Sequence, residues 1–357
     1  MKKQNLLDIL DYKSDKEVAG IPVPSVDAIL ASGGHFGHSV RKWHPAYKPF
    51  LYTKRKGIYI INVQATVQSF ENFINTVVGF LKDNKKILLV GTKKQASPFV
   101  EEFGKRYGLF YIAKKWPAGF FTNFEQVKLS INRLINYKEQ YIKFKYSYTK
   151  KELLDLERKI KKLESKYGGV TFMDTLPDLV IIIDTAFEKV ALKESRLLKI
   201  PVAGIVDSNA DPRLVDYPLF MNDDAIKTLK LFFSVLAKIF DKYGNKELLR
   251  IRSNFEEHLK SLEKEVDEAH GKLVTAQEQS EQKAEHDSAV VVRVKAFTPI
   301  EDVNYLSDKL KSALKSAGIQ SKEALERLSY EELVNIKGIG PRTARSIIKK
   351  IENNKNL

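Results

Sequence analysis

The feature of this sequence that most constrains its fold is a series of short, almost continuously apolar runs that alternate with helix-length segments. Three runs rich in Ile, Val and Leu have the length of a strand: residues 86–91, 178–184 and 201–207. Shorter runs at 109–112 and 217–221 predict two further strands, the second at an edge because it contains a proline. Runs without polar alternation are typical of strands buried on both faces. We therefore expect an α/β fold with three layers, α/β/α, around a central parallel sheet.

Other segments predict additional parts around this body. Between residues 124 and 168 apolar residues recur at helical spacing among many Lys and Arg, which predicts a helical hairpin, packed as a coiled coil and inserted into an α/β domain of residues 1–264. Residues 265–295 are acidic and rich in Ala, Gln and Ser. That composition favours a solvated, flexible linker, with a frayed helix as the alternative. Residues 296–357 predict a small all-α module.

Composition narrows the classes of protein to which the chain can belong. Its 357 residues include 60 Lys and Arg against 45 Asp and Glu, a formal charge of +15, so nucleic acid is the expected partner and an anionic membrane surface the weaker one. Cysteine is absent, which excludes disulfides, thiol nucleophiles and cysteine-bound metals. No apolar run is long enough to cross a membrane, and we expect no secretory signal at the N-terminus.

An open parallel sheet also raises the alternative of an enzyme that handles a phosphate or a nucleotide. Residues 91–97 lie between a strand and a helix, where a phosphate loop would be, but this loop lacks the second glycine and its lysines are misplaced. Few residues at the strand ends could carry chemistry, and no recognised motif links them: Lys93, Lys94, Asp184 and Asp207. A membrane-surface protein that uses the basic hairpin is a third possibility, but it leaves the aromatic and glycine-rich loops unexplained.

The strongest functional signal is a stretch without acids between Asp27 and Glu71. It combines a glycine-rich loop at residues 32–38 with Lys, Arg, His and aromatic side chains, and a second basic and aromatic cluster follows at residues 114–123. Lys and Arg neutralise phosphates, while aromatic and histidine rings stack on unpaired bases. We predict an RNA interface made by His35, His38, Arg41, Lys42, Trp43, Lys48, Lys54, Arg55, Lys56, Lys93, Lys94, Lys114, Lys115 and Trp116.

At these residues the chain resembles the family of bacterial small-subunit ribosomal protein S2. One departure is the block after Lys114: the family usually has Arg before the tryptophan and Leu-Gly-Gly after it, whereas this chain has Lys115 and Pro117-Ala118-Gly119. Lys cannot form the bidentate contact of Arg, so we expect a different local RNA contact. The tracts that carry the resemblance follow one another in the family's order: residues 32–38, 43–50, 57–63, 88–96, 116–124, 176–184, 200–212 and 222–226.

The resemblance implies a structural role, without chemistry, in the cytoplasmic small ribosomal subunit. It implies contact with 16S rRNA at the head–body junction near the messenger exit, contact with neighbouring small-subunit proteins, and help in recruiting the large messenger-binding protein of that subunit. It also implies a divalent ion, Zn²⁺ or Mg²⁺, held by His35, Asp207 and Asp223. The alternative for Asp223 is an N-cap of the helix that follows. We expect no other cofactor.

The last part of the chain lies outside this resemblance and has one of its own. Residues 333–348 resemble a helix–hairpin–helix, and the whole module resembles the C-terminal domain of the RNA polymerase alpha subunit. Gly338 and Gly340 would form a tight hairpin whose backbone N–H groups can hold a phosphate, with Arg342 and Arg345 adding charge. The motif predicts contact with DNA, RNA or RNA polymerase, and a role in protein packing alone is the alternative.

Overall fold

The structure is a computed structural model, in which residues 12–294 and 299–355 are described. The chain forms two compact units, Met1–Asp267 and Glu268–Leu357, and each is presented by itself. Among the helices of the described residues, none combines the length and the apolar character that crossing a membrane requires.

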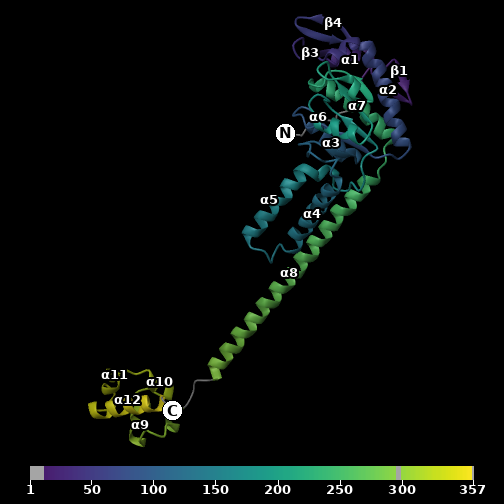
Figure 1. The fold of residues 1–357 in the computed structure, drawn as a ribbon. Helices are drawn as coiled ribbons and strands as arrows, with labels where there is room; N and C mark the ends of the chain where they lie inside the picture. The colour runs from purple at the N-terminus through teal and green to yellow at the C-terminus, as the bar shows by residue number, and fades with distance from the viewer. Residues whose placement is uncertain (1–11, 295–298, 356–357) are drawn as a thin grey trace. The chain divides into compact units, whose positions relative to one another are not determined.

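A five-stranded parallel sheet forms the centre of the first unit, as the sequence predicts (Figure 1). The strand order is β10-β9-β8-β6-β7, so the direction of winding reverses between β6 and β8. The carboxyl ends of the strands beside such a reversal are the usual place for a binding site in an open α/β sheet. The strands are β6 (Ile87–Val90), β7 (Phe110–Ile112), β8 (Leu179–Ile182), β9 (Val202–Val206) and β10 (Tyr217–Phe220).

Helices cover both faces of this sheet, which gives the three predicted layers. Alternate residues of one strand enter opposite cores, because side chains point to opposite faces along a strand: Leu89 packs into one apolar cluster and Leu88 into the other. The first face is covered by α2 (Val63–Lys82), α3 (Ser97–Tyr107) and α7 (Ile226–Tyr243). The second is covered by α6 (Lys189–Leu197) and the start of α4 (Phe124–Lys143).

A second, antiparallel sheet of order β3-β5-β4 adjoins this body. Its central strand is β5 (Ile58–Ile61), and the outer two strands are short and mostly exposed. Those outer strands are β3 (Phe36–Ser39) and β4 (Leu51–Arg55), with the 3₁₀ helix η1 (Pro45–Phe50) between them. The segment before β3 forms the hairpin of β1 (Lys16–Val18) and β2 (Ile21–Val23) and the helix α1 (Val26–Ser32).

The predicted helical hairpin is formed by α4 and α5 (Lys150–Tyr167), which lie side by side and extend from the body (Figure 1). Thr149 begins α5 with a capping box: its side chain accepts from the backbone N–H of Glu152, and the Glu152 carboxylate accepts from the N–H of Thr149. The short 3₁₀ helix η2 (Gly168–Val170) returns the chain to the sheet.

Helix α8 (Glu247–Val294) differs from the flexible linker that the sequence favours for residues 265–295, since the chain is helical as far as Val294. The segment is rich in Ala, Gln and Glu and has no proline, so it can continue the helix in spite of Gly271. The start of α8 is tied to the body by Arg252, whose guanidinium donates to the carbonyls of Gly104, Leu109 and Gly169 at 2.9–3.2 Å. The placement of residue 295 lies outside the described residues, and the boundaries of the linker stay a prediction.

The C-terminal module is all-α, as expected. Its helices enclose a small core of its own, in which Leu314, Leu325 and Leu333 are fully buried. The module consists of η4 (Ile300–Asp302), α9 (Asp308–Ser316), α10 (Lys322–Glu326), α11 (Tyr330–Val334) and α12 (Pro341–Lys355).

Candidate nucleic-acid interface and polar cluster

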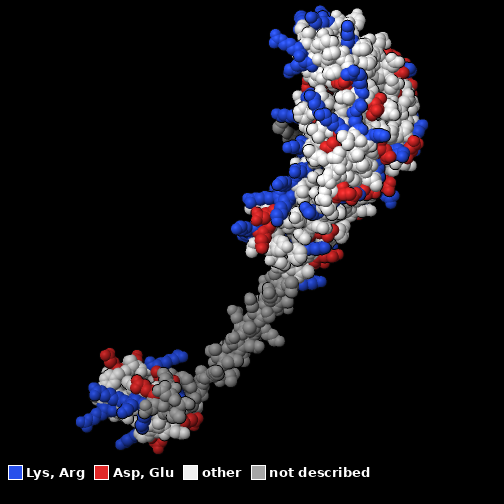
Figure 2. Space-filling view, viewed as in Figure 1, with Lys and Arg blue, Asp and Glu red and all other residues white. Residues whose placement is uncertain are grey.

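Six of the cations predicted to bind RNA lie on the antiparallel sheet and its turns. Two follow β3, one lies in η1, and three lie at the β4–β5 turn. All six side chains are exposed, and none forms an ion pair with another described residue. Figure 2 shows Lys and Arg gathered at the end of the body where Figure 1 places β3 and β4. We call this surface the basic sheet and define it by Arg41, Lys42, Lys48, Lys54, Arg55 and Lys56.

Local geometry presents these charges to solvent. Lys56 and Gly57 connect β4 to β5 with positive φ angles of 48° and 78°, which is the pattern of a tight two-residue hairpin turn. Tyr52 on β4 is exposed, so its ring is available to a base. Trp43 is half-buried and packs against Tyr59, with ring centroids 5.0 Å apart.

Trp116 is a correction to the predicted interface, because the structure places it in the core. Its ring packs against Phe120 and Phe121 at centroid distances of 5.1 and 5.0 Å, and its indole N–H donates to Glu194. A ring enclosed in this way has no face free for a base. Of the two lysines before it, Lys114 is exposed and pairs with Glu101 at 3.0 Å, and Lys115 is exposed.

The buried carboxylate of Glu194 organises the loop that follows Trp116. One oxygen accepts from the indole of Trp116 at 3.2 Å and from the backbone N–H of Gly119 at 2.8 Å, and the other accepts from the N–H of Phe121 at 2.9 Å. The role of Glu194 could not be predicted from the sequence, because a glutamate on an amphipathic helix gives no signal that it points inward.

Lys93 is the second correction. It follows β6, and its ammonium lies 2.6–2.8 Å from carboxylate oxygens of Asp184, Asp223 and Asp224. Burial acts to lower the pKa of Lys93, but the charge of Asp223 and hydrogen bonds to the three carboxylates outweigh burial and hold the pKa above its ordinary value. An ammonium surrounded in this way is not available to a phosphate of RNA. Its neighbour Lys94 is exposed.

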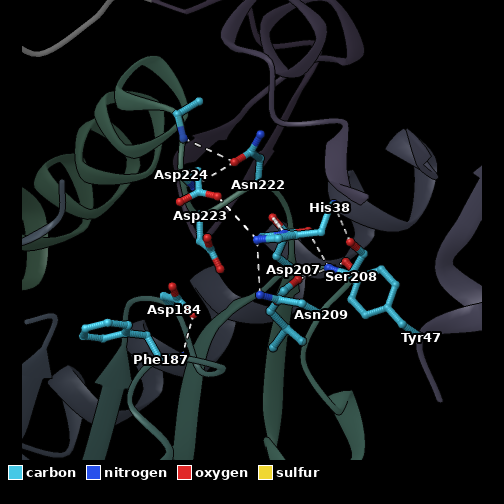
Figure 3. A network of polar contacts seen from close by, with 12 residues as sticks. His38, Tyr47, Asp184, Phe187, Asp207, Ser208, Asn209, Asn222, Asp223 and Asp224 are labelled. Atoms are coloured by element: carbon cyan, nitrogen blue, oxygen red, sulfur yellow. Dashed lines mark hydrogen bonds and ion pairs between the residues drawn. The ribbon is translucent and has the colours of Figure 1, made fainter. Parts of the chain in front are cut away.

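The parallel sheet explains why these acids meet. Asp184 follows β8, Asp207 follows β9, and Asp223 and Asp224 lie between β10 and α7, so all four stand at the carboxyl ends of strands (Figure 3). Asp184 has a φ of +67°, a left-handed conformation that Asp tolerates better than most residues, and its carboxylate accepts from the N–H of Phe187 at 2.8 Å. We call Lys93, Asp184, Asp207, Asp223, Asp224 and His38 the strand-end cluster.

His38, and not the predicted His35, is the histidine of this cluster (Figure 3). The Nδ1 atom of His38 lies 3.1 Å from Asp207, and its Nε2 atom lies 3.4 Å from Asp224. The contact with Asp207 raises the pKa of His38 above its usual value, against the effect of burial. His35 instead stacks beside Phe36 at 4.0 Å, and burial lowers its pKa.

The donor set of the cluster fits a divalent ion. Ligand atoms of His38, Asp223 and Asp224 all lie within 4.8 Å of one another. Asp223 is fully buried, and its Oδ2 has no hydrogen-bond partner among the described residues, while its Oδ1 accepts from Lys93. Burial, with the charges of Asp207 and Asp184, raises the pKa of Asp223 well above its ordinary value. Asp223 is no helix cap, because the side chain of Asn222 accepts the N–H groups of Asp224 and Ala225.

The same geometry argues against an enzyme that handles phosphate. In the loop where a phosphate would lie, the backbone N–H of Thr92 already donates to the buried carboxylate of Glu188 at 2.6 Å. Lys93 is occupied by carboxylates, so the loop presents negative charge where a phosphate would need positive charge.

In the C-terminal module, the predicted glycine hairpin precedes α12. Gly338 has a φ of +98°, and Pro341 is the first residue of the helix. The side chains of Arg342 and Arg345 are exposed, and the guanidinium of Arg345 lies 5.7 Å from the ring of Tyr330.

The fold and these surfaces define a class of protein: a basic α/β protein with a group of exposed cations on one surface. The profile described as "Ribosomal protein S2" matches residues 29–242, and the chain belongs to this family. A second profile, described as "SAM-like Helix-hairpin-helix tandem", matches residues 297–353. Family membership makes the chain a structural ribosomal protein and not an enzyme, with a cytoplasmic location in bacteria.

Curated relatives are similar over most of their length. "Small ribosomal subunit protein uS2" of Coprothermobacter proteolyticus is 41% identical over 219 residues, which cover 60% of this chain and 81% of the relative. The protein of the same name from Petrotoga mobilis is 39% identical, over 60% of this chain and 75% of the relative. The protein of the same name from Treponema pallidum is 36% identical, over 66% of this chain and 81% of the relative.

Proposed function

We propose that this protein binds 16S rRNA of the small ribosomal subunit through the basic sheet, at the head–body junction near the messenger exit, and supports translation there. The observation that carries the proposal is the group of six exposed cations that form no ion pair with another described residue, on a segment with no acid between Asp27 and Glu71. Such charges bind phosphates irrespective of base sequence, so the RNA is recognised by its shape. Contacts with neighbouring small-subunit proteins, and with the large messenger-binding protein of that subunit, belong to the same proposal.

Removing the charges of the β4–β5 turn tests this interface. Replacing Lys54, Arg55 and Lys56 together by Ala should weaken binding to small subunits about tenfold or more at moderate salt. The plot of log affinity against log salt concentration should become shallower by about 2 to 3, because three phosphate contacts are lost. Sedimentation with small subunits depleted of their own copy measures both quantities.

The matched control removes three exposed cations elsewhere on the body: Lys82, Arg106 and Lys246. If this control loses as much affinity as the turn variant, the attraction is diffuse and the proposed interface is wrong.

We propose that the strand-end cluster holds a divalent ion on His38, Asp223 and Asp224. The orphaned Oδ2 of Asp223 supports this, because a buried carboxylate oxygen without a partner is costly. The carboxylates of the cluster outnumber its cations, Lys93 and His38. The ion would neutralise the excess negative charge and so have a structural role.

Titration with Zn²⁺ should therefore raise the melting temperature of the full chain. Replacing Asp223 by Asn should abolish most of that increase, since it removes a ligand charge. Calorimetric titration of both proteins gives the affinity. The control Glu71→Gln changes a half-buried carboxylate that pairs with Lys16 outside the cluster, and it should respond as the unmodified chain does. An equal response of Asp223→Asn would exclude this site.

We propose that the hairpin at Gly338 and Gly340 holds a backbone phosphate of DNA or RNA, with Arg342 and Arg345 beside it. Replacing both arginines by Ala in the full chain should weaken binding to a mixed-sequence duplex about tenfold, because two phosphate contacts are lost. Electrophoretic mobility shift measures the affinity. The control pair Lys309→Ala and Lys322→Ala removes the same charge from other helices. Intact duplex binding together with lost RNA polymerase binding would instead favour the polymerase as the partner.

A further inference from the structure

The outer face of helix α6 carries apolar side chains that the described residues of the body leave largely exposed. The inner face of α6 is buried on the sheet through Ala191, Leu192 and Ser195. Val190 and Leu197 lie two helical turns apart on the outer face and are 50% and 74% exposed. Phe187, just before the helix, is 58% exposed, and Figure 3 shows its ring directed away from the strand-end cluster. We call Phe187, Val190 and Leu197 the α6 stripe.

The charges that the α6 segment itself presents to solvent have one sign. The two acids of the segment point inward: Glu188 accepts from Thr92, and Glu194 holds the loop after Trp116. Arg196 donates to the carbonyl of Arg213, whose exposed side chain is paired with Asp211 at 2.8 Å. The exposed cations of the segment are Lys189, Lys193, Arg196 and Lys199.

An apolar stripe with basic residues around it favours some kinds of partner over others. Two of the three stripe residues are aliphatic and offer no ring on which a base could stack, so the stripe is poorly suited to RNA. A second copy of the chain meeting the same face would set the basic rims against each other, which disfavours self-association. Exposed apolar side chains with a basic rim are complementary to a protein segment that presents apolar side chains flanked by acids.

We propose that the α6 stripe docks an acidic, amphipathic segment of another protein. Apolar side chains of the segment would cover Val190 and Leu197, and its carboxylates would face Lys193 and Arg196. The α6 stripe and the basic sheet are formed by different elements. This proposal can therefore be tested independently of the proposed rRNA contact.

Photo-crosslinking tests the proposal in the full chain. A benzoylphenylalanine at Leu197 should crosslink, in the cells that make this protein, to a protein whose crosslinked peptide has excess Asp and Glu among apolar residues. The double substitution Lys193→Glu and Arg196→Glu should lower the yield about tenfold, because like charges would then face each other. The control reversal of Lys151 and Lys162, exposed lysines of α5, should leave the yield unchanged.

A second pair of variants separates apolar contact from charge. Val190→Ser with a benzoylphenylalanine at Leu197 should reduce the yield severalfold, whereas Leu154→Ser, at a similarly exposed position on α5, should not. A crosslink to RNA, a crosslinked peptide without excess acids, or no protein crosslink at Leu197 would overturn the proposal. Sedimentation of the same variants with small subunits reports on the rRNA proposal separately.

Discussion

Replacing Glu194 by Ala should destabilise the α/β body by about 3–5 kcal/mol, since three buried or half-buried N–H donors lose their acceptor at once. Each unsatisfied buried donor costs about 1–3 kcal/mol, and the shortened side chain leaves space beneath α6 as well. The loop from Trp116 to Phe121 should loosen with it, because Glu194 joins three points of that loop. The expected loss is one of stability and not of binding, although Trp116 and the lysines before it resemble a binding loop in the sequence.

Urea unfolding of the full chain, followed by tryptophan fluorescence, measures this effect. The chain has two tryptophans, Trp43 and Trp116, so the signal reports on the body alone. Glu194→Gln should cost less than the Ala substitution, because its amide oxygen still accepts a hydrogen bond. Glu101→Ala removes a half-buried carboxylate that pairs with two exposed lysines, and it should lower the free energy of unfolding by less than about 1 kcal/mol. A Glu194→Ala variant as stable as the Glu101→Ala variant would contradict this account.

The central sheet could be predicted because the burial of its strands is visible in their amino-acid composition. β6, β8 and β9 are buried on both faces; β6 and β8 consist wholly of branched apolar residues, and β9 contains only Ala and Gly besides Val and Ile. The strands β3 and β4 could not be found in the same way. They are short and largely exposed, and their side chains do not need the alternation that would distinguish a strand from a loop.

The candidate site was predicted in outline only, because its contacts join distant parts of the chain. The choice between His35 and His38 depends on which ring reaches the strand ends, and nothing in their spacing decides that. In the sequence, Trp116 beside two lysines resembles an RNA contact. The structure shows instead that its indole donates to Glu194, which lies much later in the sequence, on α6. A basic residue in a loop is predicted to be exposed, and Lys93 is the exception because three carboxylates from two later segments enclose it.

Replacing Lys93 by Met should destabilise the body by about 3–5 kcal/mol, because it leaves buried carboxylates without their cation. Asp184 and Asp223 are almost wholly buried, and both lose a contact shorter than 3 Å. Met preserves the length of the side chain, so the loss reports on charge more than on volume. Lys94→Met, at the exposed neighbouring position, should change the stability by less than about 0.5 kcal/mol.

A double-mutant cycle identifies the cause of the Lys93 effect. If uncompensated charge dominates, adding Asp223→Asn to Lys93→Met should restore part of the lost stability, because one of the stranded carboxylates is then neutral. The coupling free energy between the two substitutions should be at least about 1 kcal/mol, as is usual for residues in direct contact. Strictly additive losses would mean that Lys93 stabilises the body through its packing, and that the strand-end carboxylates do not depend on its charge. A large coupling would show instead that the strand-end carboxylates depend on the charge of this ammonium.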